Sequence, residues 1–255
     1  GTVDFVAEHL RWYDQRLRDI DTGIDDEPPV RIFVMGENVW RSESEWPLAR
    51  TVYTKHYIGN ATAANSLHGD GVLTAERPAA PGRDRYDYDP ERPVPTLGGP
   101  IMHREYSGPH DRRPVERRDD VLVYTSRPLE RDLEVTGPVK MTLYASSSAR
   151  DTDFAATLVD VYPDGRAIHI CEGIRRARTR DSIETHTLVE PGRVCDYTID
   201  MWETSNVFKA GHRIRVDVTS SNFPRFDRNP NTGNTPGMDA ELQVAEQTVY
   251  HGGEY

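Results

Sequence analysis

The sequence predicts an all-β protein, a jelly-roll β-sandwich, with one α-helix in front of it. Three observations lead to this prediction. From residue 30 onward, apolar and polar residues alternate in short segments, as they do in half-buried strands. Turn-forming residues rather than helices separate these segments, which favours antiparallel pairing in a sandwich. Only the first twenty residues carry the three-and-four spacing of a helix.

The helix is predicted at the start of the chain, where one apolar stripe runs along residues 3–20. The stripe consists of Val3, Val6, Leu10, Tyr13, Leu17 and Ile20. Asp21-Thr22-Gly23 ends the helix, and no helix can cross the Pro28-Pro29 pair that follows. An apolar stripe must pack on something, so we interpret this helix as the last element of a preceding domain. We therefore predict a terminal helix and linker at residues 1–27 and one β domain at residues 28–255.

The strands are recognised by alternation or by short apolar runs bounded by turns. They are predicted at residues 30–35, 121–125, 139–145, 154–162, 167–174, 195–201, 213–218 and 247–251. Pro163-Asp164-Gly165 is a strong hairpin signal, so the strands on either side of it are expected to pair. Residues 59–120 are rich in Gly, Pro, Asp and Arg, and we expect an ordered excursion there rather than disorder.

Composition and charge exclude several classes of partner. The formal net charge is -11, which argues against nucleic acid and against an anionic membrane. Arginine clusters at residues 112–118 and 175–180 have acidic neighbours, so we expect salt-bridged surfaces there. No apolar run is long enough to span a membrane, and no secretory leader opens the chain. Cys171 and Cys195 form no disulfide framework and are expected to be buried free thiols in the cytoplasm.

Residues 205–233 contain a turn, an alternating strand and a loop that carries Phe223 and Phe226. Loops with large aromatic residues usually fold back on the protein and are ordered. This stretch closely resembles a passage near the end of bacterial serine hydrolases of the cocaine esterase and X-prolyl dipeptidyl peptidase group (CocE/NonD). Further blocks match this group in order, at residues 12–17, 28–36, 97–99, 118–122, 135–138, 151–154 and 160–166.

The resemblance implies that the chain is the C-terminal portion of such an enzyme. In that group an α/β-hydrolase domain precedes a jelly roll of the galactose-binding type, and the Ser-Asp-His triad lies upstream of the jelly roll. This chain has no Gly-x-Ser-x-Gly elbow, so no catalytic residue is assigned. The intact protein is expected to hydrolyse a small ester or amide through an acyl-serine, without a cofactor. The expected partner is the upstream hydrolase domain, and the helix stripe would also suit a homodimer.

The best candidate for a functional segment is the loop from Gly98 to Tyr106, called here the 98–106 loop. A glycine pair lets the backbone approach a neighbour closely, and the apolar residues Ile101 and Met102 follow shortly after it. In the enzymes that the chain resembles, the corresponding loop contributes to the wall around the acyl group of the substrate. Ile101, Met102 and His103 are therefore the candidate substrate-pocket residues. An ordinary surface loop is the alternative.

A catalytic triad inside this chain is the less favoured interpretation of its other polar residues. His169, His186 and His212 lie near acidic residues, and Ser146-Ser147-Ser148 offers hydroxyl groups. No serine, however, stands on a strained strand-to-helix elbow, and nucleophilic catalysis needs that geometry or an equivalent one.

Two acidic motifs also receive structural interpretations. Asp227-x-Asn229-x-Asn231-x-Gly233 imitates a calcium loop, but its glycine comes one position late. Side chains that cap their own loop explain this motif better, and no metal is expected. Asp151 and Asp153 are expected to cap a turn or to form an interdomain hydrogen bond rather than to act as acid and base.

The alternative function is an autonomous carbohydrate- or ligand-binding jelly-roll module. Such modules bind sugars through exposed aromatic residues, and the candidates are Trp40, Trp46, Tyr86 and Tyr88. Glycan-array binding or affinity-gel retardation discriminates between this module and a hydrolase domain, and an upstream reading frame with a Gly-x-Ser-x-Gly motif would favour the hydrolase.

Overall fold

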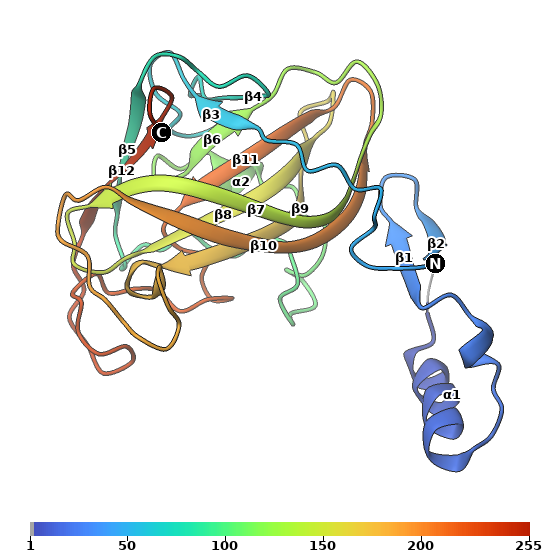
Figure 1. The fold of residues 1–255 in the computed structure, drawn as a ribbon. Coiled ribbons are helices and arrows are strands. Elements are labelled where there is room, and N and C mark those ends of the chain that lie inside the picture. Colours follow the sequence, from blue (N-terminus) through green and yellow to red (C-terminus); the bar gives the residue numbers. More distant parts are fainter. Residues whose placement is uncertain (1–2) are drawn as a thin grey trace.

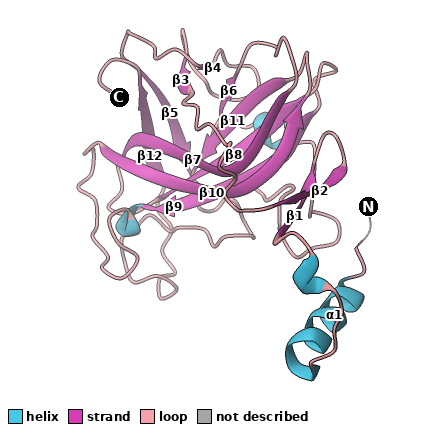
Figure 2. Cartoon of the chain, turned by 45° about the vertical axis from the view of Figure 1, so that its right-hand side comes forward, coloured by secondary structure: helices cyan, strands magenta, loops and turns pink. Residues whose placement is uncertain are grey.

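A computed structural model describes residues 3–255, and its body is a sandwich of two β-sheets (Figure 2). One sheet has four strands in the order β10-β7-β12-β5, and the other has six in the order β3-β4-β6-β11-β8-β9. Neighbouring strands are antiparallel except for the short parallel contact of β4 with β6. The predicted all-β jelly-roll sandwich with one leading helix is confirmed.

Six of the eight predicted strands agree closely with the observed bounds, and the two predicted at residues 139–145 and 195–201 are longer than expected. The four-stranded sheet consists of β5 (Gly82–Tyr88), β7 (Leu133–Ser147), β10 (Cys195–Phe208) and β12 (Ala245–His251). The six-stranded sheet consists of β3 (Tyr57–Gly59), β4 (Val72–Thr74), β6 (Leu122–Thr125), β8 (Asp153–Val161), β9 (Ala167–Arg176) and β11 (Arg213–Thr219). A separate hairpin is formed by β1 (Val30–Val34) and β2 (Val39–Glu43), and the short helices are η1 (Ile24–Asp26), α2 (Arg113–Glu116) and η2 (Ala177–Thr179). The predicted pairing across Pro163-Asp164-Gly165 is the antiparallel pair β8–β9.

The six-stranded sheet is buried on both faces at its centre. Phe154 and Leu158 of β8 belong to the main core between the two sheets, where the Phe154 ring lies 4.8 Å from that of Tyr197. Val159 and Val161 of the same strand form a small cluster on the opposite, outer face. Every residue of β8 is buried as a result. Part of this outer face is covered by α2 and the segments around it, and the 98–106 loop belongs to this cover.

The helix α1 (Phe5–Arg18) begins at Asp4, whose carboxylate accepts a hydrogen bond from the Ala7 amide. Figure 1 shows α1 projecting away from the sandwich beyond the β1–β2 hairpin. Its apolar stripe faces solvent, since the exposed fractions of the side chains Val6, Leu10, Tyr13 and Leu17 lie between 49% and 72%. Within residues 3–255 nothing packs on this face.

Three features differ from the sequence-based expectations. Residues 59–120 are ordered as expected, but they contain a full strand, β5, that was not predicted. Cys171 is buried, whereas Cys195 at the start of β10 is only half-buried, and both thiols are free. The loop after β11 is ordered, yet the ring of Phe223 stays exposed. Backbone bonds hold that loop instead, from the Thr96 amide to the Phe223 carbonyl at 2.7 Å and from the Phe223 amide to the Val94 carbonyl at 3.0 Å.

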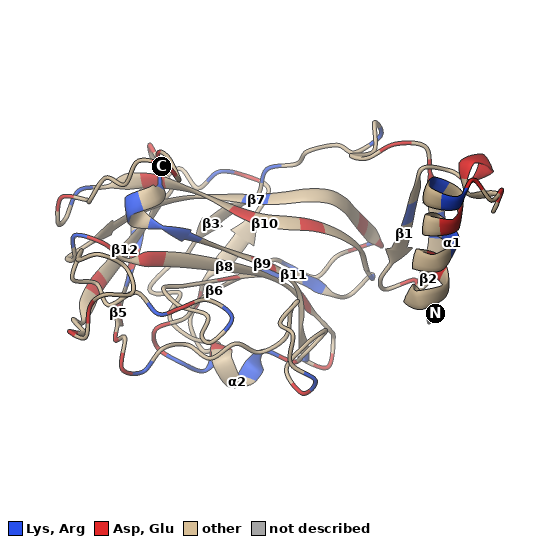
Figure 3. Cartoon of the chain, turned by 90° about the horizontal axis from the view of Figure 1, so that it is seen from below, with Lys and Arg blue, Asp and Glu red and all other residues tan. Residues whose placement is uncertain are grey.

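Charged residues of both signs are interspersed along the molecule (Figure 3). The arginine clusters are salt-bridged as expected, with Arg113 on Asp111 and Arg118 on Asp120. The expectation that both clusters lie on the surface is wrong in part, because Arg112 and Arg178 are buried in ion pairs with Asp217 and Asp151. In the part of the chain that the structure describes, no helix is long and apolar enough to cross a membrane.

Candidate functional site

The three histidines weighed for a triad do not assemble one within residues 3–255. His212 Nδ1 lies 2.9 Å from Asp160 Oδ1, but no serine hydroxyl is bonded to that imidazole in the described chain. His169 is buried with no hydrogen-bond partner on either ring nitrogen, and His186 is exposed. The Ser146 hydroxyl bonds to the Tyr250 hydroxyl. The hydroxyls of Ser147 and Ser148 accept hydrogen bonds from the backbone amides of Ala149 and Glu246. Nucleophile and base lie within hydrogen-bond reach in a catalytic triad, and the described residues show no such pair among these groups.

The carboxylates of Asp151 and Asp153 form a buried structural network. Asn229 Nδ2 donates to Asp151 Oδ2 and to Asp153 Oδ1, each at 2.9 Å. Arg178 and Arg176 complete the two ion pairs at 2.7 and 2.8 Å. Burial raises the pKa of Asp153, and the bonded Arg176 guanidinium opposes that rise. The network joins segments within the β domain, so the role of the two carboxylates is structural, although through partners that the sequence did not predict.

The calcium-like motif is a loop that caps itself. The Asn231 amide donates to Asn229 Oδ1 at 2.9 Å, which closes an Asx turn, while Asn231 Nδ2 donates to the Gln243 carbonyl at 2.7 Å. The Asp227 side chain is exposed and contacts Arg176. The side chains of the motif therefore bond to separate partners rather than converge on one centre.

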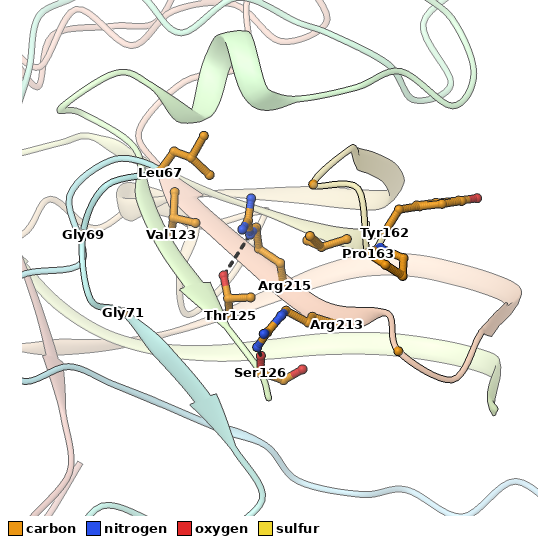
Figure 4. Close-up of a pocket in the computed structure, with 13 residues that line it drawn as sticks. Leu67, Gly69, Gly71, Val123, Thr125, Ser126, Tyr162, Pro163, Arg213 and Arg215 are labelled. Carbon is orange, nitrogen blue, oxygen red and sulfur yellow. Dashed lines mark hydrogen bonds between the residues drawn. The ribbon is translucent and has the colours of Figure 1, made fainter. Parts of the chain in front are cut away.

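An open depression of about 500 Å³ lies on the outer face of the six-stranded sheet (Figure 4). Two arginines of β11 lie in it. Arg215 donates to Thr125 Oγ1 at 2.8 Å and to the buried Glu116 carboxylate at 2.6 Å, and Arg213 donates to the Ser126 carbonyl at 3.0 Å. The Ser126 hydroxyl donates to the Arg127 carbonyl. The cavity thus offers no nucleophile paired with a base, and none of the candidate residues Ile101, Met102 and His103 lines it.

The 98–106 loop is a narrow hairpin with a closed base. The Gly98 amide donates to the Tyr106 carbonyl, and Gly99 and Gly108 exchange two backbone bonds of 2.8 and 2.9 Å. Both Gly98 and Gly99 have positive φ, at 87° and 82°. A Cβ on Gly99 would lie 2.9 Å from His169 Nε2 and 3.0 Å from Glu172 Oε1. Glycine is therefore required here twice, for the backbone conformation and for the close approach to β9.

The floor beneath this base is a cluster of buried polar side chains. Glu172 of β9 accepts a 2.6 Å hydrogen bond from Asn222 Nδ2 and forms a 2.7 Å ion pair with Arg225. Arg225 in turn donates to the Pro100 carbonyl at 2.8 Å. The contact of Arg225 Nε with Glu172 has the distance of an ion pair but not the direction of a hydrogen bond. The directional hydrogen bond of the Arg225 side chain is therefore the one to the Pro100 carbonyl. These contacts join the loop to the sheet.

The tip of the loop carries the candidate residues. Met102 is fully exposed, His103 is exposed and Ile101 is half-buried. The His103 ring stacks on Tyr106 with 4.6 Å between centroids. The tip is thus an apolar and aromatic projection on an anchored base, and within the described chain Met102 has no cover.

Half of the candidate aromatic platform for sugar binding is buried, while Trp40 is exposed and Trp46 is half-buried. Tyr86 and Tyr88 are buried, and their hydroxyls bond to Ser220 and to the Asn229 carbonyl. Trp40 remains partly exposed, with the Arg31 guanidinium 5.1 Å from its ring centroid. Two of the four candidate rings therefore cannot contact a ligand.

Comparison with known proteins places this geometry in a family. Residues 22–255 match the X-Pro dipeptidyl-peptidase C-terminal non-catalytic domain. The chain belongs to this family. Cocaine esterase of Rhodococcus sp. (strain MB1 Bresler) is 46% identical over 250 residues, covering 97% of this chain and 44% of that protein. The resemblance to CocE/NonD serine hydrolases is thereby confirmed.

Solved structures agree with this assignment. An aminopeptidase from the marine sediment archaeon Thaumarchaeota archaeon superposes with a TM-score of 0.79 at 31% identity, over 97% of this chain and 42% of that one. An α-amino acid ester hydrolase superposes with a TM-score of 0.79 at 30% identity, over 96% of this chain and 42% of that one. The chain therefore spans less than half the length of the relatives that it matches.

Sequence reasoning missed the residues that anchor the 98–106 loop. Glu172, Arg225 and Asn222 come from β9 and from the loop after β11, and no spacing rule brings these segments together. The available signal was Glu172 itself, a carboxylate among the apolar residues at the centre of β9. Charged residues are rarely buried unless they are paired, so such a residue indicates a partner elsewhere.

Proposed function

We propose that this chain is the C-terminal jelly-roll domain of a serine acyl hydrolase, packing on an α/β-hydrolase domain and lining its acyl pocket. The family is described as non-catalytic, and the relatives are esterases and peptidases of about twice this length. In this proposal the α/β-hydrolase domain supplies the Ser-Asp-His triad, and residues 1–27 belong to it. The substrate is a small ester or amide. Two free cysteines are typical of a reducing compartment and support the expected cytoplasmic location.

The observation that carries the proposal is the 98–106 loop, which presents an uncovered apolar tip on an anchored base. Exposed apolar groups on an ordered projection suit contact with a neighbouring surface. The solvent-exposed stripe of α1 suits a second contact with the same neighbour. Together they support a domain that both packs on the hydrolase and reaches its pocket.

Substitution at the loop tip tests the acyl-pocket role. In the intact hydrolase, Ile101→Ala combined with Met102→Ala should change the ratio of kcat/KM between short and bulky acyl esters. One methylene group in an apolar pocket corresponds to about 1–3 kcal/mol of discrimination. Arg104→Ala, a polar change in the same loop, is the matched control and should leave the ratio unchanged. An unaltered preference in the double variant across a homologous ester series would make the segment an ordinary surface loop.

A further inference from the structure

Arg225 connects the buried Glu172 of β9 to the 98–106 loop. Its guanidinium lies 2.7 Å from Glu172 Oε1 and donates to the Pro100 carbonyl at 2.8 Å. Pro100 directly precedes Ile101, so the bond fixes the backbone where the loop tip begins. The Arg225 amide also donates to Thr96 Oγ1 at 3.1 Å, on the other side of the glycine pair.

The other partner, Glu172, is itself held in place. Its side chain is 2% exposed, and its second oxygen accepts from Asn222 Nδ2 at 2.6 Å. A buried carboxylate with two polar partners is a rigid anchor, because losing either partner leaves an unpaired group away from water. His169 lies beside it and fills the space directly under Gly98 and Gly99. The base of the loop therefore has one preferred position.

We propose that Arg225, held by Glu172, is a positioning residue that fixes the 98–106 loop and thereby sets the shape of the acyl-pocket wall. This inference rests on the proposed function. Arg225 touches no substrate in it; the guanidinium acts through Pro100 on the side chains that follow. Arginine suits this role because its planar fork bonds two partners at once, which a lysine amine at the same place does less well.

The experiment compares Arg225→Met with a matched variant, Arg178→Met. Arg178 makes an equivalent pair of contacts, with Asp151 at 2.7 Å and with the Asn234 carbonyl at 2.7 Å, but it anchors a different loop. Both variants lose an ion pair to a buried carboxylate and one bond to a backbone carbonyl. The intact hydrolase is used for both, and cooperative thermal unfolding establishes that each variant is folded.

Two readouts are measured. The first is hydrogen exchange of the Gly98, Gly99 and Gly108 amides, which should accelerate by about tenfold or more in Arg225→Met and stay unchanged in Arg178→Met, given the strength of a charge-assisted hydrogen bond. The second is the ratio of kcat/KM between short and bulky acyl esters. It should shift in Arg225→Met, as in the Ile101→Ala/Met102→Ala variant, and Arg225→Lys should restore it in part. A purely structural loss lowers kcat/KM for all esters by the same factor and leaves the ratio unmoved.

The outcomes separate this inference from the proposed function. Unchanged amide exchange in Arg225→Met overturns the inference, whatever the kinetics show. Faster exchange with an unmoved ratio also overturns it if the loop-tip variant does move the ratio, and the proposed function then survives. If the loop-tip variant leaves the ratio unmoved, the proposed acyl-pocket role fails and the inference fails with it.

Discussion

His169 illustrates how a single buried residue couples this fold to pH. Its imidazole lies under the glycine pair of the 98–106 loop with no hydrogen-bond partner on either nitrogen. Burial, followed by the positive charges of Arg112 and Arg225, lowers the pKa of His169 to about 3. In the unfolded chain a histidine has its ordinary pKa of about 6.5. Between these two values the unfolded state binds a proton that the folded state does not.

The sign of the effect follows from this difference. The stability contributed by the neutral imidazole is fully present above pH 6.5 and is lost as the pH falls toward 3, by up to about 1.4 kcal/mol per pH unit. We predict that His169→Leu makes the decline of unfolding free energy between pH 6 and 4 shallower, as measured by urea unfolding. Val159 pairs with His169 across the strands. Val159→Ala should lower the free energy of unfolding at every pH and keep the wild-type dependence on pH. Equal slopes for wild type and His169→Leu would show that this imidazole titrates normally.

At the scale of elements, the sequence predicts strands well where the inward residues are apolar. It fails at β5, whose inward residues are Asp84, Tyr86 and Tyr88. Asp84 is buried because it accepts hydrogen bonds from the Tyr124 hydroxyl at 2.8 Å and the Ala64 amide at 2.7 Å. An inward carboxylate breaks the alternation of apolar and polar residues that predicts a strand. Burial nevertheless alternates, since Arg83, Arg85 and Asp87 point outward.

The long strands β7 and β10 extend beyond their predicted ends for a related reason. The register of their pairing shifts between Asp200 and Glu203, and Trp202 has a positive φ of 66°. This bulge interrupts the alternation at Met201, where the predicted strand stops, while the backbone pairing continues to Phe208. Alternation indicates side-chain burial, whereas a strand is defined by backbone hydrogen bonds. At a bulge the alternation stops although the backbone pairing continues.

The helix α1 gives a prediction about association. Leu10→Ser combined with Leu17→Ser should reduce self-association of this chain in sedimentation experiments, because both side chains are exposed on the apolar stripe. The unfolding free energy should change by less than about 1 kcal/mol, as expected for surface positions. Phe154→Ala in the core is the contrasting variant and should cost about 3–5 kcal/mol. A large loss of stability in the helix variant would mean that the stripe already packs on the sandwich.

At the scale of the whole molecule, alternation and turn signals predict the sandwich, while the candidate site is predicted from a glycine pair, an apolar pair and the resemblance. Ile101 and Met102 are two apolar residues in a polar loop, and only the surface that they meet gives them a role. The anchor beneath them, Glu172 with Arg225, joins residues that are far apart in sequence. A local sequence pattern predicts neither the surface of another domain nor an ion pair between distant residues.

We propose a division of labour in which this domain shapes the acyl pocket and the α/β-hydrolase domain performs the chemistry. It is tested most directly by producing the upstream hydrolase portion separately, mixing it with this chain, and measuring fluorophosphonate labelling and hydrolysis of an acyl-ester series. The account predicts labelling of a serine in the upstream portion only, with no hydrolysis by this chain alone. Adding the wild-type chain should change the acyl preference, and adding the Ile101→Ala/Met102→Ala chain should not reproduce that change. Two results would contradict this proposal. One is a labelled serine within this chain, and the other is an acyl preference that is the same with and without the added chain.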